Sequence, residues 1–177
     1  GSEMCIRDSK DASHFFTGDA QDFSRTVDYS GFIEKYRDQA NEPYVLGYYA
    51  HLIADDIWLK GFYLPWLKNR MEANAEIAAL YHQDFRLLNA KLVTYYGIKE
   101  ELRAELAGPA VIFELEEVNG SDLTFFIPYA LADLEFDDAA IQEKLQVFTF
   151  EQIIGYIETS VDVAIVKIKQ LLEVKSV

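Results

Sequence analysis

The chain contains three histidines, and the residues around one of them have a spacing that suits metal chemistry. His51 and Asp55 are four residues apart, so on a helix their side chains point in nearly the same direction. A neutral imidazole and a carboxylate are suitable ligands for zinc, and the small Gly47 on the same face leaves room for an ion. The spacing supports an alternative equally well, in which Asp55 only accepts a hydrogen bond from His51 and orients it.

Asp84 is the second candidate, because it falls in the middle of the apolar face of a predicted helix. A carboxylate buried there is costly unless it is paired, hydrogen-bonded or bound to a cation. We therefore consider two roles: a catalytic or metal-linked carboxylate, and a buried acceptor for a tyrosine hydroxyl or a backbone group. If the position has no function, Asp84→Leu should be tolerated or stabilising. His82 lies on the opposite, polar side and is predicted to be a surface residue.

The elements that must position these residues are predicted to be helices. Asn41 as N-cap and Pro43 in the first turn predict a helix to about Gly61, which carries His51 and Asp55. A second helix start is predicted near Pro65.

A long helix over 73–96 carries Asp84 and should end at Gly97, a residue suited to a helix C-terminus. A shorter helix is predicted over 99–106. Thr149 and Gln152 have the spacing of a capping box and predict the start of a last helix that runs to the end of the chain.

Hydrophobic periodicity predicts which residues of the first and last segments are buried. Two short helices are expected over 19–38, with buried side chains at Phe23, Val27, Phe32, Ile33 and Tyr36. The last helix has a predicted core stripe of Ile153, Ile154, Ile157, Val161, Ala164, Ile165, Ile168 and Leu172.

Residues 110–120 are the one segment where a strand could form, since Asn119-Gly120 between apolar runs is a hairpin signal. Ser121-Asp122 could equally cap a helix that contains Pro128. We favour the helix, so the predicted fold class is all-α.

Length and composition predict one helical domain over 10–177. Residues 1–9 lack periodicity, begin with Gly-Ser, and are expected to be a tag or foreign leader. The formal charge of −14 disfavours broad contact with nucleic acid or an anionic membrane. With a single cysteine, no visible signal peptide and no apolar run of about 18 residues, we expect a cytoplasmic protein without stable membrane insertion.

The run from Gly47 to Trp58, GYYAHLIADDIW, resembles the G-Y-x-x-H-L-x-x-D-x-x-W helix of bacterial zinc-dependent phospholipase C-like proteins. The preceding Ser13-His14-Phe15 resembles the His-Phe element of that family. The segment from Tyr81 to Asn89 is similar to one found in its small uncharacterised branch. The likeness extends loosely from about Lys10 to the C-terminus.

This resemblance implies a helical bundle of the phospholipase C and P1 nuclease type, with zinc held by His14, His51 and Asp55. It implies hydrolysis of a small phosphoester, and we expect Asp55 and Asp84 to be its catalytic carboxylates. The chain departs from the family in lacking its further N-terminal ligands and its later His-x-x-x-Glu pair, so a His-rich trinuclear site cannot be built. The alternative is a non-catalytic helical scaffold that binds a ligand or partner.

Overall fold

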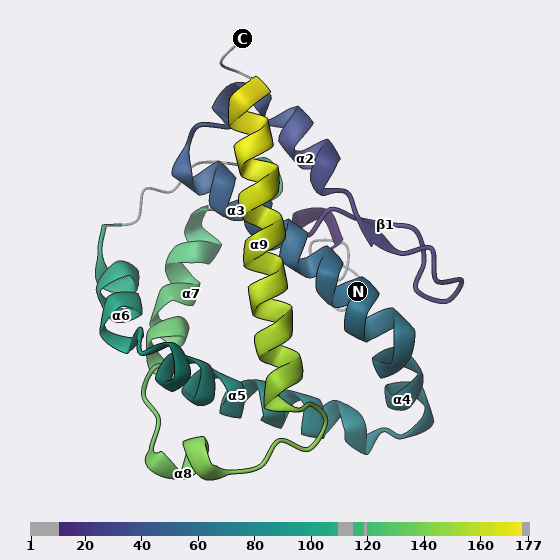
Figure 1. The fold of residues 1–177 in the computed structure, drawn as a ribbon, viewed down its shortest axis with the longest axis vertical. Coiled ribbons are helices and arrows are strands. Elements are labelled where there is room, and N and C mark those ends of the chain that lie inside the picture. Colours follow the sequence, from purple (N-terminus) through teal and green to yellow (C-terminus); the bar gives the residue numbers. More distant parts are fainter. Residues whose placement is uncertain (1–10, 110–114, 119, 175–177) are drawn as a thin grey trace. The chain divides into compact units, whose positions relative to one another are not determined.

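The computed structural model describes residues 11–109, 115–118 and 120–174 (Figure 1). These residues are mostly helical, which confirms the all-α prediction. They form two compact units, one of residues up to Asn69 together with those from Ile154 onward, and one of Arg70–Ile153. The leader expected at residues 1–9 lies outside the described part. Within that part, no helix has both the length and the apolar character needed to cross a membrane.

The first unit begins with a short antiparallel hairpin of β1 (Phe16–Thr17) and β2 (Thr26–Val27), in which Phe16 lies opposite Val27. Helix α2 (Tyr29–Lys35) and the 3₁₀ turn η1 (Arg37–Gln39) follow.

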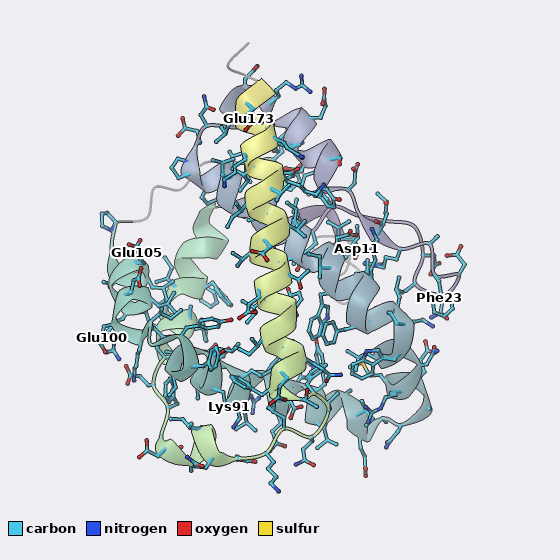
Figure 2. All side chains as sticks on the ribbon, viewed as in Figure 1. Asp11, Phe23, Lys91, Glu100, Glu105 and Glu173 are labelled. Atoms are coloured by element: carbon cyan, nitrogen blue, oxygen red, sulfur yellow. The ribbon has the colours of Figure 1, made fainter. Side chains whose placement is uncertain are left out.

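The prediction of two helices over 19–38 is wrong in its first half, where the hairpin loop lies instead. Gly18 has a left-handed φ of +72°, and a Cβ there would lie 2.4 Å from the carbonyl oxygen of Ser24. Asp19 and Asp22 accept hydrogen bonds from backbone N–H groups two residues ahead, which stabilises turns against helix. Phe23, predicted to be buried, is 53% exposed in this loop (Figure 2).

Helix α3 (Pro43–Trp58) is the central helix of the first unit and carries both predicted ligands of the His-x-x-x-Asp pair. Pro43 begins the helix as expected, but the N-cap is Glu42 rather than Asn41. Apolar residues of α3 and α2 are buried against each other, namely Phe32, Val45, Tyr49, Leu52 and Ile53.

The predicted new start at Pro65 is also wrong. After Trp58 the chain continues as a π-helix, η2 (Leu59–Leu67), which contains Pro65, and then as α4 (Lys68–Ala73). A proline removes one backbone donor, and the wider π turn is one way for a helix to continue past an interrupted hydrogen-bond ladder.

Helix α9 (Phe150–Val174) belongs to the first unit from Ile154 onward. Tyr156 lies edge-on to Trp58, with ring centroids 5.2 Å apart, and also contacts Phe62. The predicted core stripe holds at Ile153 and Ala164, which are buried, but Val161, Ile165 and Leu172 are exposed. An apolar stripe is buried only where other elements cover it, and periodicity does not say where that is.

The second unit contains α5 (Glu76–Tyr96), α6 (Lys99–Ala107), α7 (Gly120–Ala132) and α8 (Asp138–Gln142). Within it α5 packs on α8, and α6 packs on α7 (Figure 1). The favoured helix with an internal Pro128 is present as α7. In the preceding segment the structure describes one isolated bridge, Leu115 to Val118, while residues 110–114 and 119 lie outside the description.

Two predicted helix boundaries are confirmed by their capping interactions. Gly97 ends α5 with a left-handed φ of +66°. At the start of α9, the Thr149 N–H donates to Gln152 Oε1 at 2.9 Å and the Gln152 N–H donates to Thr149 Oγ1 at 3.2 Å. These reciprocal bonds form the predicted capping box.

We expect Gly97→Ala to lower the free energy of unfolding by about 1 kcal/mol, because alanine is strained in the left-handed region even where its Cβ meets no neighbour. Gly155→Ala is the matched control, since Gly155 lies within α9 and also has open space around a Cβ. It should raise stability by up to about 1 kcal/mol. Urea denaturation of both variants measures the difference, and changes of the same sign would contradict this account of the α5 terminus.

Candidate metal centre

His14, His51 and Asp55, the three predicted ligands, lie together in the first unit. His14 Nδ1 is 2.6 Å from Asp55 Oδ2, and His51 Nε2 is 3.3 Å from the same oxygen. One ligand atom from each side chain lies within 4.8 Å of the other two. Across the described residues, this is the group of histidine, cysteine and acidic side chains whose spacing suits a metal ion.

Helix α3 positions two members of the cluster directly. His51 and Asp55 are one turn apart, so both project from the same face toward His14. The two imidazole rings lie at 62° with centroids 5.2 Å apart. The side chain of His51 is 48% exposed and that of Asp55 is 22% exposed, so the cluster is open to a ligand from solvent.

The segment that carries His14 is fixed to the rest of the unit by its backbone. The hydroxyl of Tyr48 donates a hydrogen bond to the carbonyl of Ser13. The N–H of Asp28 donates to the carbonyl of Phe15 at 2.8 Å, and Phe15 itself has a left-handed φ of +52°. A non-glycine residue in this region carries strain that the surrounding contacts must offset.

Asp56, the neighbour of Asp55, holds the hairpin against α3. Its Oδ1 atom accepts from the Val27 N–H at 3.2 Å and from the Thr26 hydroxyl at 3.1 Å. Lys60 Nζ donates to its Oδ2 atom at 2.6 Å, and Asp56 is buried. Two consecutive carboxylates therefore have different roles: Asp55 contacts the histidines, while Asp56 fixes the strand that pairs with the His14 segment.

Aromatic rings enclose the side of the cluster that faces the hairpin. Phe16 stacks on His14 with centroids 5.6 Å apart, and the guanidinium of Arg25 lies 4.2 Å from the centroid of Phe16. Tyr48 contacts His51 edge-on at 5.8 Å. The stacking of Phe16 thus limits the rotation of the His14 ring, and the contact with Tyr48 limits that of His51.

Sequence reasoning missed Tyr48 and Asp56 as residues that position the site. Tyr48 is three residues before His51 and therefore on the same helical face, which is a usable signal. Asp56 offers no such signal, because its partners are backbone and side-chain groups about 30 residues earlier.

Burial lowers the pKa of His51, and the nearby His14 adds to that effect, while the Asp55 carboxylate acts in the opposite direction. The lowering of the pKa by burial is larger than the raising by Asp55, although about half of the His51 side chain remains exposed. The lowered pKa favours the neutral form of His51, and a neutral imidazole is the form that binds metals.

Asp84 belongs to the second unit and is fully buried. Its Oδ1 accepts from the N–H of Gln146 at 2.8 Å, and its Oδ2 accepts from those of Val147 and Phe148 at 2.7 and 3.1 Å. The second role considered for this residue, a buried acceptor for backbone groups, is the one that these contacts support. His82, expected at the surface, is exposed.

Comparison of the chain with protein-family models, with curated proteins and with solved structures finds no match. The geometry of the residues themselves therefore carries the functional argument.

In metal-free protein, the pKa of His51 should lie below the ordinary value of 6.5 and fall further in Asp55→Asn, which removes the charge that raises it. Since the unfolded chain then binds the proton more tightly than the folded one, this residue should reduce stability as pH falls through the ordinary value. An NMR titration of the imidazole protons measures the pKa, and a value at or above 6.5 would disprove the assigned effect of burial.

Asp84→Leu should lower the free energy of unfolding by about 3 kcal/mol or more, because it leaves three backbone N–H groups without their acceptor. This is the opposite of the result expected if Asp84 had no role, in which case leucine would be tolerated or stabilising. Asp133→Leu, at an exposed carboxylate of the same unit, is the control and should change stability by less than about 0.5 kcal/mol. Equal thermal melting temperatures for the two variants would contradict the structural role.

Proposed function

We propose that this chain binds one zinc ion through His14, His51 and Asp55 and uses it to hydrolyse a small phosphoester. The observation that carries the proposal is the convergence of two imidazoles on one carboxylate oxygen of Asp55, one from His14, 41 residues earlier in the chain, and one from His51, one helical turn earlier. Every other feature of the proposal depends on that convergence.

The residue types and distances fit zinc. Catalytic zinc sites use three protein ligands, chiefly histidine and carboxylate, and leave a fourth position for water or substrate. With ligands about 2.0–2.2 Å from the ion, neighbouring ligand atoms of a tetrahedral site lie about 3.3 Å apart. The pair of His51 Nε2 and Asp55 Oδ2 is already at 3.3 Å, whereas His14 Nδ1, at 2.6 Å, would move outward slightly as its hydrogen bond is replaced.

A zinc ion held by these residues would supply an activated water and would stabilise charge on the phosphoryl oxygens. The chain's own contribution is to fix the ligands. Asp55 supplies the negative charge and the central oxygen, and Tyr48 and Asp56 hold the His14 segment in place. Asp84 has a structural role in this proposal because its carboxylate is bonded to backbone groups of its own unit.

The resemblance of the Gly47–Trp58 segment to the phospholipase C-like helix supports the same chemistry. The helical architecture agrees with that resemblance at the level of fold class, and the specific phospholipase C and P1 nuclease type of bundle is part of the proposal. The formal charge of −14 does not oppose a phosphoester substrate, since a bound cation outweighs the surrounding field locally.

One observation favours a second function, that of a non-catalytic helical scaffold. The 2.6 Å hydrogen bond between His14 and Asp55 links the two side chains directly. In that case the three residues would attach the N-terminal segment to α3, and removing one of them would affect folding rather than metal content.

We expect the purified, zinc-loaded and dialysed protein to retain about one zinc per chain and to hydrolyse bis(p-nitrophenyl) phosphate in a chelator-sensitive reaction. His51→Ala should weaken zinc binding by about 100-fold or more and abolish the hydrolysis, because it removes one of three ligands. His82→Ala is the matched control, since it removes the exposed histidine of the other unit and should change neither property.

Elemental analysis, calorimetry and the hydrolysis assay separate the alternatives. Zinc binding that depends on His51 but comes without hydrolysis would favour the scaffold. A chain that retains no zinc, or binds it equally well after His51→Ala and His82→Ala, would overturn the metal centre itself.

A further inference from the structure

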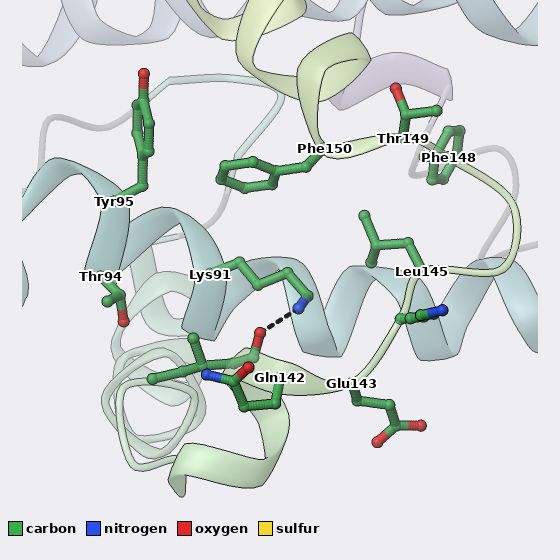
Figure 3. Close-up of a pocket in the computed structure, with 11 residues that line it drawn as sticks. Lys91, Thr94, Tyr95, Gln142, Glu143, Leu145, Phe148, Thr149 and Phe150 are labelled. Carbon is green, nitrogen blue, oxygen red and sulfur yellow. Dashed lines mark hydrogen bonds between the residues drawn. The ribbon is translucent and has the colours of Figure 1, made fainter.

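The second unit contains a pocket of about 530 Å³, formed by α5, α8 and the segment that leads into α9 (Figure 3). All of its lining residues belong to Arg70–Ile153, whereas the proposed ligands of zinc belong to the first unit. The volume is within the range of small-molecule sites, about 300–1,000 Å³. We therefore consider a ligand for this pocket that is independent of the proposed zinc site.

Its walls are mainly apolar and aromatic. Tyr95 and Phe150 face each other edge-on, with centroids 5.5 Å apart, and Leu145 and Phe148 also contribute to the lining (Figure 3). Tyr95 is 58% exposed, so one of these walls is accessible from solvent. Such a lining favours a ligand with an apolar body.

Two lysines, Lys91 and Lys144, line the pocket, and Lys91 is the one with a hydrogen bond to a neighbouring element. The Nζ atom of Lys91 donates a hydrogen bond to the carbonyl of Ile141, drawn as a dashed line in Figure 3. An ammonium group has three N–H donors and a full charge, and a neutral carbonyl satisfies one donor without balancing that charge.

Among the described residues, no carboxylate forms an ion pair with Lys91. Glu143 also lines the pocket, but its side chain points away from Lys91 (Figure 3). It accepts a hydrogen bond from Gln83 at 2.8 Å. The chain has 30 acidic and 16 basic residues, so carboxylates are abundant. An ammonium that pairs with none of them, beside an apolar cavity, therefore indicates a position for an anionic ligand.

We propose that this pocket binds a small organic carboxylate whose apolar body lies against Tyr95 and Phe150 and whose carboxylate pairs with Lys91. One ammonium is a compact point charge that matches one carboxylate, and the partly buried setting strengthens the pairing relative to a fully exposed ion pair. Lys144 also lines the pocket and adds to the positive potential at this site.

The proposal is tested on the full chain with 4-phenylbutanoate as the probe and 4-phenylbutanamide as its neutral isostere. Calorimetry and amide chemical-shift changes should show saturable binding of the carboxylate, about tenfold or more tighter than that of the amide. The shifts should map to the pocket, including Tyr95 and Phe150. Chelator is present throughout, and His51→Ala should bind the probe as the unchanged chain does, which separates this site from the proposed zinc site.

Lys91→Met should reduce the affinity for the carboxylate to that for the amide and leave the affinity for the amide unchanged. Lys91→Arg should retain most of the carboxylate affinity, and Lys169→Met on the exposed part of α9 should have no effect. Lys91→Met could fail to fold, because α8 loses its hydrogen bond. In that case the affinities of the unchanged chain for 4-phenylbutanoate and 4-phenylbutanamide still test whether the pocket selects a carboxylate. Equal affinities for the two probes, no saturable binding up to about 10 mM, or undiminished binding to folded Lys91→Met would each overturn the proposal.

Discussion

A single carboxylate oxygen, Oδ2 of Asp55, is the point on which the organisation of the N-terminal segment and the proposed chemistry both depend. Two imidazoles reach it, His51 from one turn earlier on α3 and His14 from a segment outside the helix. A partly buried negative charge between two histidines needs either their N–H groups or a cation to stabilise it. The same geometry therefore serves a hydrogen-bonded cluster and a metal centre, and the proposed function follows from the second.

The precision of this cluster depends on contacts outside it. His14 could occupy many positions if its segment were held only by its own side chain, because ordering a residue's backbone costs about 1–2 kcal/mol. The hydrogen bond from Tyr48, the pairing of β1 with β2 and the buried Asp56 carboxylate restrict that freedom. Helix α3 thus carries two of the three proposed ligands and also Tyr48 and Asp56, which align the segment of the third. A change at Asp56 is expected to affect the site through the hairpin rather than through direct contact.

The sequence predicted those features that depend on neighbours within one or two helical turns. The pairing of His51 with Asp55, the glycine that ends α5 and the capping box before α9 all follow from short spacings, and the structure contains them. His14 was placed with that pair through a resemblance rather than a spacing, since 41 residues separate it from Asp55. Features set by distant partners were not predicted: the three N–H donors to Asp84 lie 62–64 residues away, and the exposure of Val161 depends on what covers α9.

The most direct test of the account is the coordination of zinc in the loaded protein, observed by X-ray absorption and by anomalous diffraction at the zinc edge. The account predicts one ion with two imidazole nitrogens and one carboxylate oxygen, at about 2.0–2.2 Å, located at His14, His51 and Asp55. An ion found elsewhere, or an environment with fewer than two imidazoles, would contradict it.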